Sequence, residues 1–361
     1  MPKVAVAVPV KDEAERIAAC LTAIARQEAA PTPLVVLLIN NSTDGTARIA
    51  RRCASRLSLN VDMREISLSP ERANAGTARS LAMARAASLA GPDGVLVTTD
   101  ADGCVPPDWL ATNLRGLAAG ADAVAGRAVI DPEEAKLIPS ALHEADAREC
   151  AYAALIDEIA SLLDPDPLDS WPRHDEASGA SLAVRVATYH AVGGMPEVPL
   201  GEDRRFVRAL LDHDLHVRHD PAVWVTVSGR TEGRAKGGMA ETMRRRMSAP
   251  DLLLDDRLEN ADAAVRRARL RRTARFVHAG LIPPTLLAVD LDLPCDAIAD
   301  ALCGPFGLGW AKLETMAAVL RRFRMPVADL PVQTSAAARI RGMLLRSAQS
   351  NRDDTALAAR A

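Results

Sequence analysis

The chain has 361 residues, which is enough for one large α/β domain with an extension or for two domains. Hydrophobic residues make up 48% and charged residues 25% of it, ordinary values for a globular protein that argue against long disordered regions. The formal net charge of −3 gives no support to nucleic-acid binding, which usually needs a visibly basic surface.

The start of the chain and its cysteines indicate the cellular compartment of the protein. The apolar residues 1–10 are followed at once by Lys11, Asp12 and Glu13, without a small-residue cleavage site, so they are interpreted as a first strand. No apolar run approaches the roughly 20 residues needed to cross a bilayer. The six cysteines are widely scattered and lack metal-ligand spacing, which favours reduced thiols. We therefore predict a cytoplasmic protein without transmembrane segments, and a peripheral membrane contact stays open.

The first hundred residues alternate between strand and helix patterns. Residues 3–10 and 34–39 are apolar runs that predict strands, and the apolar positions Ile17, Leu21 and Ile24 between them recur at helical spacing. This βαβ unit predicts a parallel sheet with a right-handed crossover. A further short strand is expected near residues 60–66, followed by a long alanine-rich helix that ends at Ala90.

Two carboxylates one residue apart follow the next strand. Residues 95–97 form a short apolar run, and Asp100 and Asp102 come where such a strand ends. Ligands of open α/β sheets collect beyond the carboxyl ends of the strands. Two hard oxygen ligands suit Mg²⁺ or Mn²⁺, ions that proteins usually hold with one or two carboxylates plus the phosphates of a substrate. The pair therefore favours a metal-diphosphate site, and its alternative is a turn former or helix N-cap.

The second half of the chain continues the pattern and then changes character. Strands are predicted at residues 123–130, 178–185 and 217–227, the last interrupted at residues 219–221. Between the first two, residues 133–163 read as helical, and a proline-rich segment follows. Residues 228–238 are rich in glycine and basic residues, and beyond residue 239 the pattern is almost wholly helical.

Several segments together resemble glycosyltransferase family 2. Residues 8–13 are similar to the family's opening Val-Pro-x-x-Asn-Glu, and residues 40–46 to its Asp-Asp-x-Ser-x-Asp-x-Thr loop. Residues 100–102 resemble its Asp-x-Asp metal motif, and residues 179–185, 192–194 and 201–203 its acceptor-side block. The match covers roughly residues 3–240, and the order of the motifs makes it specific.

The resemblance implies a fold and an activity. The expected fold is GT-A, a Rossmann-like, mostly parallel central α/β sheet flanked by helices, with a C-terminal helical extension. The glycosyltransferase domain would span residues 1–240, with a nucleotide-binding half at about 1–103 and an acceptor half at about 104–240, and the extension would span 241–361. The implied reaction is metal-dependent transfer of a sugar, with inversion, from a UDP- or GDP-sugar to an acceptor hydroxyl, with Mn²⁺ or Mg²⁺ as the cofactor.

The same resemblance assigns roles to individual residues. Asp203 is expected to be the base, with Glu202 as the orienting or alternative carboxylate. Asp102 is the expected direct metal ligand, Asp100 contacts ribose or metal, and His219 is a candidate third ligand that reads equally well as a loop histidine. The expected nucleotide contacts are Pro9, Val10, Asp12, Glu13, Asn40, Asn41, Asp44, Arg79, Asp100 and Ala101, together with Arg230 and Arg234, which would close over the diphosphate.

The chain departs from the family pattern at the nucleotide loop. Asn40 and Asn41 stand where two acids are usual, which weakens the expectation of uracil recognition and leaves a guanine nucleotide open. Asp12 replaces a usual Asn. Two other function classes stay open: a nucleotidyltransferase acting on a sugar phosphate, which would normally show a Gly-rich basic loop after the first strand, and a non-catalytic sugar-nucleotide-binding module. For the arginine-rich helical tail, a homodimer face, an acceptor lid and a contact with anionic lipid stay open, and a solvated surface is the default interpretation.

Overall fold

The computed structural model of the chain describes residues 3–231, 233 and 237–358, with side chains up to residue 350. The chain forms two compact units: the residues up to Pro139 with His174–Ser248, and Ser140–Arg173 with the chain from Ala249 on. The boundary expected after residue 240 lies inside helix α9, and the second unit also includes Ser140–Arg173, which we had assigned to the acceptor half.

One sheet organises the first unit. Within the described residues, seven strands lie in the order β3-β2-β1-β4-β6-β5-β7, and β6 is antiparallel to both of its neighbours while the other pairs are parallel. This confirms the expected mostly parallel sheet. The strands are β1 (Val4–Val10), β2 (Leu34–Asn40), β3 (Val61–Ile66), β4 (Val95–Thr98), β5 (Ala123–Ile130), β6 (Leu182–Arg185) and β7 (Val217–Val227).

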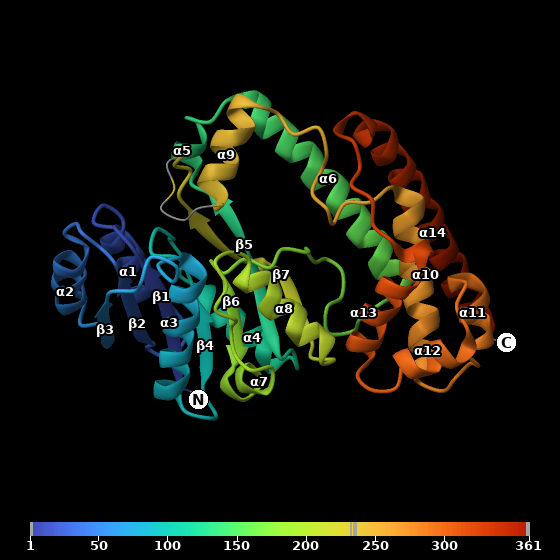
Figure 1. Ribbon diagram of the computed structural model, residues 1–361, viewed down its shortest axis with the longest axis horizontal. Coiled ribbons are helices and arrows are strands. Elements are labelled where there is room, and N and C mark those ends of the chain that lie inside the picture. The colour runs from blue at the N-terminus through green and yellow to red at the C-terminus, as the bar shows by residue number, and fades with distance from the viewer. Residues whose placement is uncertain (1–2, 232, 234–236, 359–361) are drawn as a thin grey trace. The chain divides into compact units, whose positions relative to one another are not determined.

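Helices cover both faces of this sheet, as Figure 1 shows. Successive residues of β1 point to opposite faces: Val6 and Val8 join the core beneath α1, α2 and α4, while Ala5 and Ala7 join the core beneath α3, α7 and α8. The small side chains of Ala5 and Ala7 allow the alanine-rich helix α3 to pack close to the sheet. The helices of this unit are α1 (Ile17–Ala25), α2 (Thr46–Leu57), α3 (Ala75–Ala90), α4 (Trp109–Ala118), α5 (Pro132–Ala135), α7 (Val186–Ala191), α8 (Glu202–Asp212) and α9 (Met239–Ser248).

The strand ends bring the predicted motifs together. Because β1, β2 and β4 are parallel neighbours, the loops that follow them leave the same edge of the sheet. An antiparallel bridge between Cys104 and Thr226 then places the end of β7 beside the turn that follows β4. The segment after β7 is thereby brought to the Asp-x-Asp turn.

The second unit is helical. Its helices are α6 (Ser140–Leu163), α10 (Ala261–His278), α11 (Thr285–Leu291), α12 (Cys295–Ala301), α13 (Phe306–Met316) and α14 (Leu330–Ala358), with short 3₁₀ helices at Ala318–Leu320 and Val327–Asp329. Helices α10 and α14 both pack against α6, and two apolar clusters form the core. Among the described helices, none combines the length and apolar character required to span a membrane.

Candidate active site

The turn after β4 holds two carboxylates in different surroundings. Asp100 accepts a hydrogen bond from the Arg79 guanidinium at 2.5 Å. Asp102 is largely buried and lies 3.2 Å from the guanidinium of Arg230. Burial and the neighbouring Asp100 raise the pKa of Asp102 to about 6, although Arg230 acts in the opposite direction. In this environment a nearby cation stabilises the ionised form of the carboxylate.

Arg79 connects the two sides of the predicted site. It projects from α3, is 5% exposed, and donates to Glu202 at 2.9 Å as well as to Asp100. Its remaining donors bind the Thr98 hydroxyl at 2.9 Å and the Gly179 carbonyl at 2.7 Å. Burial alone would lower the pKa of Arg79, but the two carboxylates outweigh it and raise the pKa, so the guanidinium stays charged. Arg79 therefore ties the Asp-x-Asp turn to the start of α8.

Asp203 lies next to this network at the start of α8. Its carboxylate accepts hydrogen bonds from the backbone N–H of Gly179 at 2.8 Å and of Arg204 at 2.7 Å. Gly179 is a position where only glycine fits, because a Cβ atom there would lie 2.5 Å from Nε of Arg79. Glu202 is buried and bound to Arg79, whereas Asp203 is half-buried. Of the two predicted acids, Asp203 is thus the more exposed.

The loops after β1 and β2 hold each other through their carboxylates. Asp12, at a φ of 50°, accepts from the Thr43 backbone N–H at 2.7 Å, and Asp44 accepts from the backbone N–H of Ala14 at 3.1 Å and of Thr46 at 2.9 Å. Both predicted nucleotide residues thus shape the loops. A ligand would meet a cradle whose geometry is already set by these bonds.

The remaining predicted nucleotide contacts differ in what they can offer. The Asn41 amide is bound on both sides to the backbone of Leu68, at 2.9 and 3.0 Å. Asn40 is 2% exposed, and the side chains of Val10 and Ala101 belong to the core, so these last two could contact a nucleotide mainly through their backbone. Pro9 is half-buried in β1.

A second arginine enters the site from the segment after β7. Arg230 binds the carboxylate of Glu13 with two hydrogen bonds, at 2.6 and 2.9 Å, and also contacts Asp102. The neighbouring Gly229 N–H donates to Glu134 at 2.8 Å, and Glu134 in turn accepts from Arg16 at 2.6 Å. Our sequence reasoning missed Arg16 and Glu134. Arg16 follows Glu13 by three residues, which is the signal that could have placed it at the site.

Two predicted residues remain. Arg234 lies outside the described residues. His219 is a buried residue of β7 whose ring lies edge-on to that of His174, with 5.7 Å between the ring centroids. Strand β7 is continuous at the expected interruption, although its register with β5 shifts there. In the part of the chain that is described, no group of three or more His, Cys, Asp or Glu side chains could hold a metal ion, so Asp100, Asp102 and His219 are not gathered into one.

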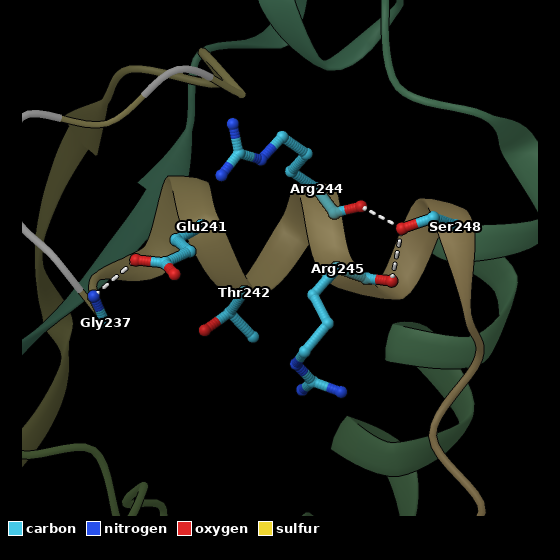
Figure 2. Close-up of a pocket in the computed structure, with 6 residues that line it drawn as sticks. All are labelled: Gly237, Glu241, Thr242, Arg244, Arg245 and Ser248. Carbon is cyan, nitrogen blue, oxygen red and sulfur yellow. Dashed lines mark hydrogen bonds between the residues drawn. The ribbon is translucent and has the colours of Figure 1, made fainter.

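Two hollows lie in the same unit. One of about 300 Å³ is lined by Arg230 and Thr231 together with Leu137, Ile138, Gly229 and Met247, so the segment expected to close over the diphosphate forms part of its wall. The other, of about 330 Å³, is lined by residues of α9 and its lead-in, and Figure 2 shows Arg244 and Arg245 extending from that helix in different directions. Among the described residues that line the second hollow, none is a predicted site residue.

Comparison with known proteins identifies the first part of the chain. Residues 5–164 match the model of the family described as glycosyl transferase family 2. Over these residues, somewhat less than half of its length, the chain resembles glycosyltransferase family 2. The expected family and enzyme class are therefore confirmed. The matched residues include β1, the nucleotide loop, Arg79 and the Asp-x-Asp turn, whereas Asp203 and Arg230 lie beyond them. No curated protein matches the sequence significantly.

Solved structures of glycosyltransferases resemble the fold at low sequence identity. The mannosyltransferase PcManGT from Pyrobaculum calidifontis, in complex with GDP-Man and Mn²⁺, is 20% identical, with a TM-score of 0.45 over 98% of this chain and 88% of that one. Residues 1–349 of S. aureus TarS with UDP-GlcNAc are 15% identical, with a TM-score of 0.47 over 87% and 90%. Glucosyl-3-phosphoglycerate synthase from Mycobacterium tuberculosis, with Mg²⁺ and UDP, is 16% identical, with a TM-score of 0.41 over 70% and 81%.

Proposed function

We propose that this glycosyltransferase transfers a sugar, with inversion, from a UDP- or GDP-sugar to an acceptor hydroxyl, that it uses Mn²⁺ or Mg²⁺, and that Asp203 is the base. The observation that carries the proposal is the buried Arg79 network, in which one guanidinium binds both Asp100 on the donor side and Glu202 on the acceptor side. The motif expected for the donor and the motif expected for the acceptor therefore meet at one place. A transferase needs this arrangement, because the acceptor oxygen must reach the anomeric carbon of the bound donor as the bond to the diphosphate breaks.

The residues around Asp102 fit a divalent cation. Mg²⁺ and Mn²⁺ bind to one or two carboxylates and complete their coordination with substrate phosphates and water. Asp102 supplies such a carboxylate, and Asp100 is bound to Arg79, so we assign Asp102 as the protein ligand. When bound, the ion would act as a Lewis acid that stabilises the leaving diphosphate. Arg230 lies beside Asp102 and has the planar donor geometry that suits phosphate oxygens.

Asp203 is positioned to accept the proton of the acceptor hydroxyl. The Gly179 N–H holds one of its oxygens, and its neighbour Glu202 is fixed by Arg79, so the start of α8 is rigid. A rigid base saves the entropy that would be lost on ordering it at the moment of reaction. Direct attack by the acceptor oxygen on the anomeric carbon leads to inversion and requires no carboxylate nucleophile.

The metal site is tested by calorimetric titration of UDP and GDP, with and without Mn²⁺, into wild type and Asp102→Asn. We expect one nucleotide to bind in a metal-dependent manner and the variant to lose at least about tenfold in affinity, or 1.4 kcal/mol. Asp62→Asn, which removes a carboxylate on β3, is the matched control and should bind as the wild type does. Metal-independent binding that Asp102→Asn leaves unchanged would contradict the metal assignment.

The base is tested by steady-state kinetics of Asp203→Asn. Loss of general-base catalysis should lower kcat by about 100-fold or more while the affinity for the donor stays the same. Asp212→Asn, at the other end of the same helix, is the control. Unchanged turnover by Asp203→Asn would show that Asp203 is not the base. Release of nucleoside diphosphate distinguishes this reaction from nucleotidyl transfer, which would release pyrophosphate from a nucleoside triphosphate.

A further inference from the structure

Arg230 already provides Asp102 with a cation. Its guanidinium lies 3.2 Å from Oδ2 of Asp102, and two further hydrogen bonds, at 2.6 and 2.9 Å, hold it on Glu13. The side chain of Glu13 is 7% exposed, so the anchor is buried, while Arg230 itself is 22% exposed. The arginine is thus held against the carboxylate that we assign to the metal.

The charges around Asp102 make this contact significant. Glu13, Asp100 and Asp102 place three carboxylates in a small region, and Asp100 is bound to Arg79. Arg16, another cation that acts on Asp102, is itself bound to Glu134. Arg230 therefore offsets the charge of both Glu13 and Asp102 in the structure.

A divalent ion and Arg230 cannot both remain close to Asp102 at low cost. An ion coordinated at roughly 2 Å from the carboxylate would lie within a few ångströms of a guanidinium that is 3.2 Å from the same group. Charges of +2 and +1 at such a separation repel each other strongly, even at the effective dielectric constant near a protein surface. Arg230 must then move away from Asp102 or receive a new anionic partner.

We propose that Arg230 is an intramolecular counter-cation that competes with the divalent ion for Asp102, so that metal and nucleotide bind cooperatively. The donor diphosphate provides the anionic partner that Arg230 needs when the ion takes Asp102. The free ion alone binds weakly, because it must displace a bound guanidinium. This inference rests on the proposed function, since it assumes that Asp102 is the metal ligand.

The test measures Mn²⁺ binding directly, by the electron paramagnetic resonance signal of the free ion, with and without UDP or GDP. Free Mn²⁺ is corrected for its complex with the nucleotide. For the wild type we expect nucleotide to tighten Mn²⁺ binding by about tenfold or more, within the usual range for coupled sites. For Arg230→Gln without nucleotide we expect Mn²⁺ to bind about tenfold more tightly than to the wild type, and the coupling to be largely lost.

Two further variants serve as controls. Arg230→Lys keeps the cation and should return Mn²⁺ affinity toward the wild-type value. Arg85→Gln removes an arginine that pairs with Asp62 away from the site, at 2.8 and 3.1 Å, and should leave Mn²⁺ binding unchanged. Circular dichroism of each variant establishes that it is folded.

The outcomes separate this inference from the function on which it rests. If Mn²⁺ binds through Asp102 but Arg230→Gln neither tightens its binding nor reduces the coupling, the competition proposed for Arg230 is wrong while the metal site stands. If Asp102→Asn binds Mn²⁺ and nucleotide as the wild type does, the metal assignment itself fails. Tighter Mn²⁺ binding by Arg230→Gln, reversed in Arg230→Lys, supports the inference.

Discussion

Arg79 is a buried residue that carries a full charge and has its donors distributed between two carboxylates and two other oxygens. A buried ion pair contributes little relative to an apolar core, but removal of one partner leaves the other charge buried and uncompensated. Here the loss of Arg79 would leave Glu202 buried without a counter-charge and would increase the repulsion between Asp100 and Asp102 in the Asp-x-Asp turn. The main role of Arg79 is therefore to hold Asp100 and Glu202 in position.

We predict that Arg79→Gln lowers the free energy of unfolding by about 3 kcal/mol, because Glu202 loses its counter-charge while buried. Urea denaturation at pH 7.5 measures the change. Arg85→Gln, whose pair with Asp62 is more exposed, should cost under about 1 kcal/mol. Equal losses in the two variants would contradict the assigned importance of burial.

Among the elements, β3 and α3 show how the edge of the sheet is joined to a helix. Asp62 of β3 accepts hydrogen bonds from Arg85 of α3, and it also pairs with Arg64 in its own strand. The Arg85 hydrogen bond is the main cause that lowers the pKa of Asp62 to about 2. The folded state thus binds a proton at Asp62 less readily than the unfolded chain does.

This shift predicts a pH dependence of stability. A lowered pKa means that the contribution of Asp62 is complete above its ordinary value near 4 and is lost as the pH falls toward 2. Asp62→Asn should therefore reduce the free energy of unfolding at pH 7 by under about 1 kcal/mol, a small value because the pair is partly solvated. The difference from wild type should shrink as the pH falls through about 2 and vanish only below that value. Denaturation at several pH values measures it, and a difference that grows on acidification would show the opposite sign.

At the scale of the whole molecule, the described site residues belong to the sheet unit, while the helical unit has its own apolar cores. Leu313 of α13 is fully buried in one of these. The architecture therefore separates the stability of the helical unit from the chemistry assigned to the other.

We predict that Leu313→Ala lowers the stability of the helical unit by about 2–5 kcal/mol, from lost burial and the cavity that remains. The affinity for nucleotide should stay within about twofold of wild type at temperatures where both units are folded, since Leu313 packs in a core of the helical unit whereas the described site residues belong to the sheet unit. Thermal unfolding and calorimetric titration measure the two quantities. Val332→Ala, at a position that is 68% exposed, is the control.

Local patterns were sufficient for much of the fold. The period of the apolar residues predicted β1, α1, β2 and the strand that leads to Asp100 and Asp102, because burial of one face imposes that period on the sequence. The position of both acids beyond a strand end followed from the same pattern. The family resemblance supplied the roles that the residues alone left open.

Other features depend on contacts that no local pattern encodes. Arg79 meets Glu202 across 123 positions because α3 and α8 pack on the same face of the sheet. Arg230 meets Glu13 across 217 positions because β1 and β4 are neighbours in the sheet and the bridge between Cys104 and Thr226 brings the end of β7 to the turn after β4. The packing of Ser140–Arg173 into the helical unit is likewise not encoded locally. Helical periodicity shows that one face of a helix is buried, but it does not identify the segment that covers this face. The sequence by itself determined the elements and the places of the acids; the tertiary structure decided which charges meet, because ion-pair partners are chosen by packing and topology.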